Sequence, residues 1–176
     1  MLCNDKKQIE KAKFLATQAR DNAHHYEHSE VGYNYRMSNV CAAIGLGQLR
    51  VLSKRVIRKR EIFNFYKDEL SGIEEITFLE EPEGSFSNYW LTTILLDERG
   101  AIDREQLRLH LERDNIESRP LWKPMHLQPI FQNCRSYVNG VSEGFFNRGL
   151  CLPSGTNMSD ADLKRVVRQV KKLYEA

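Results

Sequence analysis

Two short segments of the sequence combine side chains that could bind a charged ligand. The first, residues 32–38, places an amide (Asn34) and a guanidinium (Arg36) beside two phenols, just before an expected helix start at Ser38. Helix N-termini attract anions through free N–H groups and the helix dipole, and Asn and Arg add directed donors. The segment therefore predicts a phosphate or carboxylate site, with a capped turn as the alternative.

The second segment, residues 118–129, contains three prolines between polar and aromatic side chains. Its candidate ligand-binding residues are Arg119, Trp122, Lys123 and His126. Prolines favour an extended, fixed backbone, and rigid loops that display donors and a stacking face often bind ligands. A ligand-binding loop is one interpretation, and a proline-braced crossover on the surface is the other.

Three histidines close together raise the question of a metal site. His24 and His28 have the i, i+4 spacing of two ligands on one helix face, with His25 between them. Glu27 is misplaced for an HExxH motif, and no third ligand is indicated. We expect a polar loop and no metal.

A basic run, residues 54–60, contains five lysines and arginines. The chain carries a net charge of only +2, so we expect a solvated helix face and no nucleic-acid partner. Gly45 and Gly47 fall inside a helical pattern, so they do not form a phosphate-binding loop and instead indicate a closely packed neighbour. Cys41, on the same helix, is expected to pack as a small hydrophobic residue.

Helices are expected over residues 5–20 and 38–70, the second capped by Ser38 and ended at Gly72. Strands are expected at 76–78 and 90–96, and residues 116–131 should be extended rather than helical. Two further helices should start at capping boxes, Asp103 with Gln106 and Ser159 with Asp162. The pattern predicts an α+β fold.

Length and composition favour a compact, intracellular protein. The chain has 176 residues, 28% charged and 41% hydrophobic, which suits one domain of ordinary size. It has no apolar run of about 18 residues and no signal-peptide pattern, so we expect no membrane partner. The four cysteines contain no CxxC pair, and we expect reduced thiols in the cytoplasm.

The two candidate segments carry a family resemblance. Residues 28–49 read HSEVGYNYRMSNVCAAIGLGQL, residues 119–131 read RPLWKPMHLQPIF, and residues 149–174 read GLCLPSGTNMSDADLKRVVRQVKKLY. Their order and spacing resemble the nucleotide-sugar aminotransferases of the DegT/DnrJ/StrS group over essentially the whole chain. Within that group the sequence is most similar to enzymes that aminate C4 of a UDP-linked 4-keto-6-deoxy sugar for surface-glycan synthesis.

The resemblance implies the aspartate-aminotransferase fold (fold type I) and the cofactor pyridoxal 5′-phosphate. The chain corresponds to the small C-terminal domain, a long helix with a small, mainly antiparallel sheet packed by helices. In the family a lysine of the large N-terminal domain holds the cofactor as a Schiff base, and glutamate is the expected amino donor. No lysine of this chain matches that position, so no catalytic residue is assigned.

The family organisation assigns residues 1–37 to a connecting helix and active-site loop, 38–70 to the long helix and 71–176 to the small domain. The resemblance implies cofactor-phosphate contacts for Asn34 and Arg36. It also places Arg119, Trp122, Lys123 and His126 at the border of the sugar-nucleotide pocket. We expect a homodimer, and a chain that is inactive without the large domain, which lies outside it. The alternative is a non-catalytic dimerisation or binding module.

Overall fold

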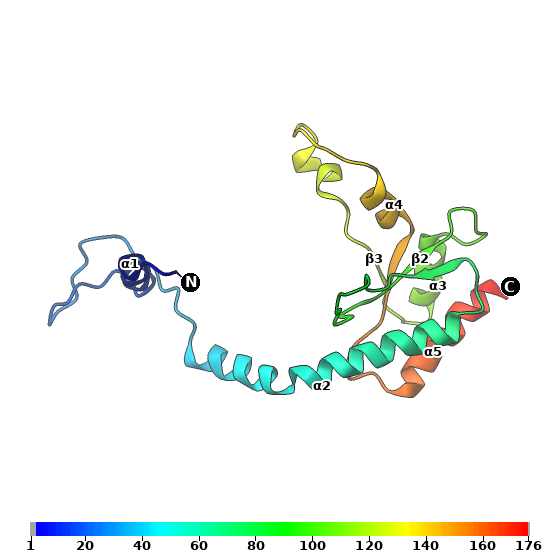
Figure 1. Cartoon of the computed structure of the whole chain (residues 1–176), viewed down its shortest axis with the longest axis horizontal. Coiled ribbons are helices and arrows are strands. Elements are labelled where there is room, and N and C mark those ends of the chain that lie inside the picture. The colour runs from blue at the N-terminus through cyan, green and yellow to red at the C-terminus, as the bar shows by residue number, and fades with distance from the viewer. Residues whose placement is uncertain (1–2, 176) are drawn as a thin grey trace. The chain divides into compact units, whose positions relative to one another are not determined.

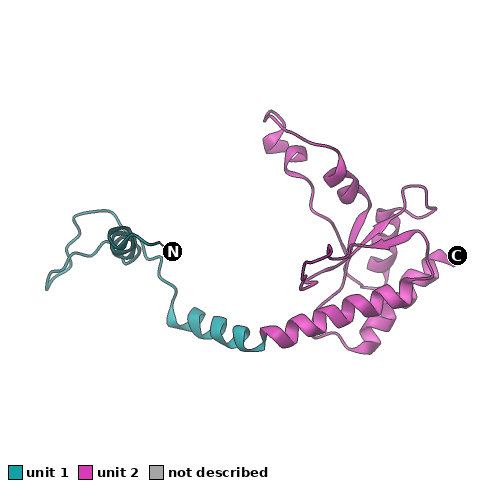
Figure 2. Cartoon of the chain, viewed as in Figure 1, with its two compact units in different colours: residues 1–51 teal, residues 52–176 magenta. Residues whose placement is uncertain are grey.

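The computed structural model describes residues 3–175, which form two compact units (Figure 2). The first unit extends to Val51 and the second begins at Leu52. Helix α2, Asn39–Leu70, contributes residues to both units. None of the described helices combines the length and the apolar character that crossing a membrane requires.

The first unit is built around helix α1, Lys6–Ala16, which begins at the N-cap Asp5. The carboxylate of Asp5 accepts a hydrogen bond from the Lys7 amide at 2.9 Å. The helix ends before the predicted residue 20, because Gln18 and Ala19 adopt positive φ angles of 69° and 49°. Left-handed residues end a right-handed helix, so this expectation was wrong at the C-terminal end.

After a loop, the chain folds back against the C-terminal end of α1. Thr17 and Asn34 form an isolated antiparallel bridge, supported by backbone bonds from Gln18 to Tyr33 and from Tyr33 to Leu15. Gly32 is required at this crossing, because a Cβ atom there would lie 2.3 Å from the Ala19 nitrogen. Sequence patterns predict a loop here, but not its pairing with the helix end.

Helix α2 begins where the sequence predicts, with the Ser38 hydroxyl accepting a hydrogen bond from the Cys41 amide at 3.2 Å. Every side chain from residue 39 to 50 is exposed in the described chain. Cys41 is therefore exposed rather than packed. The expected neighbour of Gly45 and Gly47 is also missing, since no described atom lies within 4 Å of a Cβ built at either position.

The second unit contains a four-stranded antiparallel sheet in the order β1-β2-β4-β3. Figure 1 labels two of these strands, β2 and β3. Its strands are β1 (Ile76–Phe78), β2 (Thr92–Leu96), β3 (Arg119–Pro120) and β4 (Gly149–Leu152). The two predicted strands are confirmed. The sequence did not predict β4, which pairs Leu150 with Ile94 at the centre of the sheet.

Helices α3 (Arg104–Arg113) and α5 (Asp160–Tyr174) start at the two predicted capping boxes, and both boxes are formed. The core lies between one face of the sheet and the helices α2, α3 and α5. It includes Ile62, Tyr66, Ile94, Leu96, Leu107, Leu111, Leu150, Leu152, Leu163 and Val167. The result is the α+β fold that the sequence predicts.

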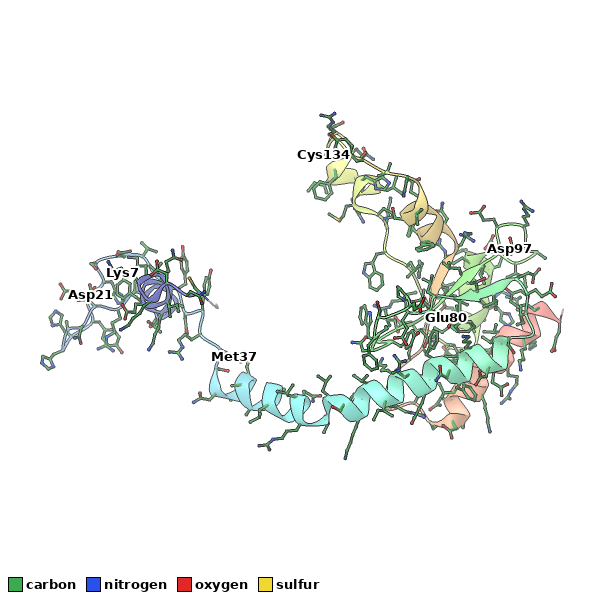
Figure 3. All side chains as sticks on the ribbon, in the orientation of Figure 1. Lys7, Asp21, Met37, Glu80, Asp97 and Cys134 are labelled. Atoms are coloured by element: carbon green, nitrogen blue, oxygen red, sulfur yellow. The ribbon has the colours of Figure 1, made fainter. Side chains whose placement is uncertain are left out.

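The segment between α3 and β4 differs from the prediction. Residues 116–131 are not extended throughout, because they contain two single-turn 3₁₀ helices, η1 (Met125–Leu127) and η2 (Pro129–Phe131). An unpredicted helix, α4 (Val141–Arg148), follows them. Figure 3 shows the side chains of the segment between β3 and β4, with Cys134 near the tip that lies farthest from the sheet.

Candidate functional site

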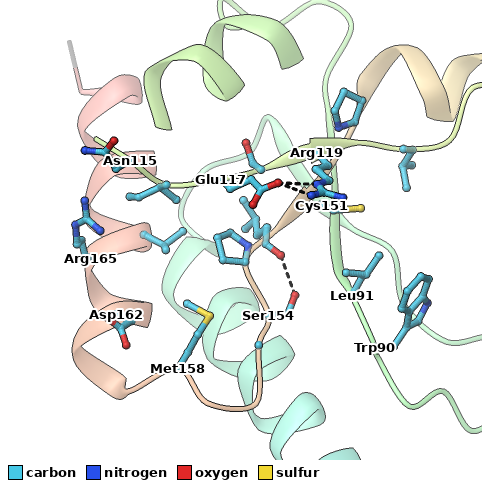
Figure 4. A pocket seen from close by; sticks show the side chains of 18 of the residues that line it. Trp90, Leu91, Asn115, Glu117, Arg119, Cys151, Ser154, Met158, Asp162 and Arg165 are labelled. Atoms are coloured by element: carbon cyan, nitrogen blue, oxygen red, sulfur yellow. Dashed lines mark hydrogen bonds and ion pairs between the residues drawn. The ribbon is translucent and has the colours of Figure 1, made fainter. Parts of the chain in front are cut away.

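A hollow of about 910 Å³ lies in the second unit, between the edge of the sheet and the start of α5 (Figure 4). Three stretches form most of its lining, residues 115–122, residues 151–155 and the first turns of α5. Its volume is within the range of small-molecule sites. Two of the predicted substrate residues, Arg119 and Trp122, are in this lining.

An aromatic pair occupies one side of the hollow. The rings of Trp90 and Trp122 stack with centroids 5.7 Å apart and an interplanar angle of 28°. Trp90 is 59% exposed and Trp122 is 64% exposed, so both rings remain available to a ligand. Trp90 is not among the predicted site residues, although these are the two tryptophans of the chain.

Arg119 lies at the rim of the hollow on β3. Its Nε and Nη2 atoms donate to Glu117 Oε1 at 2.8 and 2.5 Å. Both side chains are largely exposed, so this ion pair contributes little to stability. A guanidinium has five N–H donors, so Arg119 retains donors for an anionic ligand.

The segment that follows β4 forms one wall of the hollow, and side chains from one face of α2 donate hydrogen bonds to it. Four α2 side chains donate to the segment 153–158. These bonds join Arg55 to Thr156 Oγ1, Arg58 to Met158 O, Lys59 to Ser154 O and Tyr66 to Pro153 O.

Three of these donors, Arg55, Arg58 and Lys59, belong to the basic run. Arg60 of the same run pairs with Glu81 instead. The expectation of a solvated face was therefore wrong for Arg58, Lys59 and Arg60, which are partly buried, whereas Lys54 and Arg55 are exposed.

The remaining predicted substrate residues are outside this hollow. His126, on η1, is mostly buried, and its Nε2 lies 2.8 Å from Glu143 Oε1 of α4. It lines a separate hollow of about 370 Å³ together with Cys134 and Tyr137. Lys123 is exposed, and in the sequence it lies between Trp122 of the larger hollow and His126 of the smaller one. The structure thus joins Arg119 with Trp122 and separates both from His126.

In the first unit, Asn34 lines a shallow hollow with Gln18 and residues 28–33. Its backbone is fixed by the bridge to Thr17. Arg36 is exposed and follows Tyr35, whose ring stacks on Tyr33 at 5.1 Å. Asn34 and Arg36 both present polar donors in the few residues before α2, but only Asn34 lines the hollow.

Two histidines of this unit have partners within it. His28 Nδ1 lies 2.9 Å from the Gln18 carbonyl, and His25 Nε2 lies 3.2 Å from Glu27. Among residues 3–175 there is no group of three or more side chains arranged to hold a metal ion. These contacts agree with a polar, hydrogen-bonded loop.

A model of the DegT/DnrJ/EryC1/StrS aminotransferase family matches residues 1–171. Among curated proteins, EpsN of Bacillus subtilis, named as an inferred pyridoxal phosphate-dependent aminotransferase, is 44% identical over 99% of this chain. The GDP-perosamine synthase of Vibrio cholerae is 35% identical over 94% of the chain. The matches cover 45% of each relative, so the chain spans about half the length of the curated proteins that it matches.

Solved structures agree with this similarity. The aminotransferase TlmJ from Streptoalloteichus hindustanus superimposes with a TM-score of 0.80 at 25% identity, over 98% of this chain and 47% of TlmJ. PseC of Helicobacter pylori, an aminotransferase of pseudoaminic acid biosynthesis, gives a TM-score of 0.81 at 20% identity, over 98% of this chain and 47% of PseC. The fold of the described chain thus has counterparts in solved aminotransferase structures.

Proposed function

Because the chain belongs to the DegT/DnrJ/EryC1/StrS aminotransferase family, we propose that it is the C-terminal part of a cytoplasmic, pyridoxal phosphate-dependent sugar aminotransferase. The reaction moves an amino group from an amino acid, glutamate in our proposal, to a nucleotide-linked 4-keto-6-deoxy sugar for surface polysaccharide or glycan synthesis. The names of relatives include GDP-, UDP- and dTDP-linked sugars, so the proposal covers nucleotide sugars as a class.

The family match over nearly the whole chain carries this proposal. The chain also exposes an apolar surface that a larger enzyme would cover. Val40, Ile44 and Leu49 are each more than 60% exposed, on a stretch of α2 whose side chains are all exposed. A helix that is apolar on several sides is normally buried. We propose that the remaining half of the enzyme packs on this stretch, and that the chain alone does not transfer amino groups.

The cofactor, when bound, supplies an electron sink for the transfer. We propose that Asn34 and Arg36 hold its phosphate, because an amide and a guanidinium are suitable phosphate donors. The fixed backbone of Asn34 fits this role, since the bridge to Thr17 holds it in one place before any ligand binds. In the proposed homodimer this segment serves the partner's site.

The substrate contacts are proposed for β3 and the loop that follows it. Arg119 and Trp122 line the larger hollow, where a guanidinium can pair with phosphate oxygens and an indole can stack on a planar ring. Lys123 and His126 belong to the same loop, and we propose that they border the pocket in the assembled enzyme. The bond from His126 to Glu143 would then fix the loop on α4.

A chimeric enzyme tests the proposal. This chain would replace the corresponding C-terminal part of the GDP-perosamine synthase of Vibrio cholerae, and GDP-perosamine formation from glutamate would be measured by mass spectrometry. We expect an active chimera, and an Asn34→Ala version that requires more pyridoxal phosphate for the same rate. A folded chimera that binds the cofactor but forms no amino sugar would contradict the proposal.

The isolated chain provides the second arm of this test. We expect no amination, and borohydride reduction with pyridoxal phosphate should label no single lysine stoichiometrically. One stoichiometrically labelled lysine together with amination would contradict the proposed dependence on the rest of the enzyme.

The alternative, a dimerisation module without catalysis, is favoured by the exposed apolar stretch of α2. Such a module would form a defined dimer of the isolated chain. A defined dimer in the ultracentrifuge together with a folded, inactive chimera would support the module. An active chimera would exclude it.

A further inference from the structure

One lysine of α2 contacts two of the segments that form the wall of the larger hollow. Lys59 Nζ donates to the carbonyl of Trp90 at 2.7 Å and to the carbonyl of Ser154 at 2.5 Å. Trp90 lies before β2 and Ser154 lies after β4, and both line the hollow. An ammonium group has three donors, so one side chain can hold both carbonyls at once.

Packing and hydrogen bonds on either side of Trp90 hold its backbone in place. Tyr89 is buried and stacks on Phe63 of α2, with ring centroids 3.8 Å apart. The Trp90 amide donates to Asn88 Oδ1 at 3.1 Å. The bond from Lys59 fixes the remaining backbone polar group of Trp90, its carbonyl, against the same helix.

Ser154 is fixed in a similar way. Its hydroxyl accepts a hydrogen bond from the buried Thr92 amide at 2.9 Å and donates to the Leu152 carbonyl at 2.8 Å. Lys59 holds the carbonyl of the same residue. Partial burial lowers the pKa of Lys59 through desolvation.

We propose that Lys59 is a positioning residue of this hollow, which ties the carbonyls of Trp90 and Ser154 together and thereby keeps the Trp90 ring stacked on Trp122. The consequence for substrate binding rests on the proposed function, whereas the positioning of the two rings does not. Lys59 acts through these two segments, and the hollow's lining does not include it.

The two tryptophans of the chain are the two members of this stack, so the isolated chain carries its own reporter. Stacked indoles produce an exciton couplet in the far-ultraviolet circular dichroism, and a Trp122→Phe variant gives the spectrum without it. We expect Lys59→Met to lose most of the couplet while the helical signal is kept. Lys59→Arg, which retains a charged donor, should restore it.

The matched control is Lys54→Met, which removes an exposed lysine from the same basic run of α2. We expect its couplet to equal that of the original chain. If Lys59→Met does not fold, Lys59→Gln, which keeps a shorter donor, replaces it and should show a weakened couplet. A full couplet in the folded variant at position 59 would overturn the proposal.

The active chimera extends the test to the substrate. We expect Lys59→Met to raise the KM for the nucleotide sugar about tenfold, the size expected from losing a charged hydrogen bond, with the KM for glutamate unchanged. An unchanged KM for the nucleotide sugar would remove the link to binding. A chimera that is inactive before any substitution contradicts the proposed function alone, because the couplet is measured on the isolated chain.

Discussion

Single charged residues organise the turn that precedes β2. Arg60 donates to both carboxylate oxygens of Glu81, at 3.0 and 2.7 Å, and the Ser87 amide donates to the same carboxylate. The guanidinium also lies 4.6 Å from the ring centre of Phe86 and 5.0 Å from that of Tyr89. The turn that leads to Trp90 is therefore folded around one bidentate ion pair.

This ion pair makes the free energy of unfolding depend on pH in the acid range. Hydrogen bonds from the Arg60 side chain and the Ser87 amide lower the pKa of Glu81 from 4.5 to about 2. Because the folded pKa is below the unfolded one, the contribution is complete above about pH 4.5 and is lost as the pH falls toward about 2. We expect Glu81→Gln to reduce stability at neutral pH and to flatten this part of the acid profile.

Urea unfolding at several pH values measures this effect. The control is Glu83→Gln, an exposed glutamate of the same turn, which should leave the profile unchanged. Equal acid profiles for Glu81→Gln and the original chain would contradict the role of the pair.

A buried hydroxyl provides the second prediction at this scale. Tyr66 is fully buried and donates to the Pro153 carbonyl at 2.9 Å, and burial raises the pKa of its phenol. Tyr66→Phe leaves that carbonyl without this donor, so we expect a loss of about 1 kcal/mol in the free energy of unfolding. Tyr137→Phe, at an 82% exposed position, should cost nothing measurable in the same urea experiment.

The residue types of the candidate site were predictable, but their grouping in space was not. Arg119 and Trp122 were identified from their loop, and both line the larger hollow. Trp90 was missed because its neighbours are set by the pairing of β2 with β4, which brings Thr92 opposite Leu152. No local pattern encodes that pairing.

Helices that begin at a local capping signal were predictable, because that signal does not depend on a distant partner. The capping boxes at Asp103 and Ser159 use side chains three residues apart, so the sequence alone specifies them. Helix α4 was missed because it has eight residues and a left-handed glycine, Gly140, where a capping side chain would stand. Strand β3 is two residues long and depends on its partner β4.

The cap of α5 gives a prediction at this scale. The Ser159 hydroxyl accepts from the Asp162 amide at 3.2 Å and donates to the Asp162 carboxylate at 2.7 Å. Ser159→Ala removes both bonds, and we expect it to cost about 1 kcal/mol of unfolding free energy. Ser136→Ala, at an exposed loop position, is the control in the same denaturation series. A cost no larger than that of the control would contradict the role of the cap.

Helix α2 should open unevenly along its length. Its buried residues are Ile62, Phe63, Tyr66 and Leu70, whereas residues 39–50 are exposed. Gly45 and Gly47 each weaken the exposed turns by about 1 kcal/mol relative to alanine. In the isolated chain we expect faster amide hydrogen exchange at 43–50 than at 62–70, measured by mass spectrometry. Equal protection along the helix would show that something covers the exposed turns.

At the scale of the whole molecule, the exposed turns of α2 should govern association. The isolated chain presents Val40, Ile44 and Leu49 to water, and such a surface favours self-association. We expect sedimentation to show concentration-dependent assembly, which replacement of these three residues by glutamine should weaken without changing the unfolding of the second unit. An unassociated chain at high concentration would contradict this prediction.

The hydrogen bonds from α2 to the segment 153–158 also affect the thermodynamics of ligand binding. Freezing a mobile loop at a binding site costs conformational entropy, which reduces affinity. Here the carbonyls of Pro153, Ser154 and Met158 are already held by α2 before a ligand arrives. A ligand that enters the hollow meets a wall whose ordering entropy was lost when the protein folded. A ligand that binds there would therefore lose less affinity to the ordering of this segment than it would at a mobile loop.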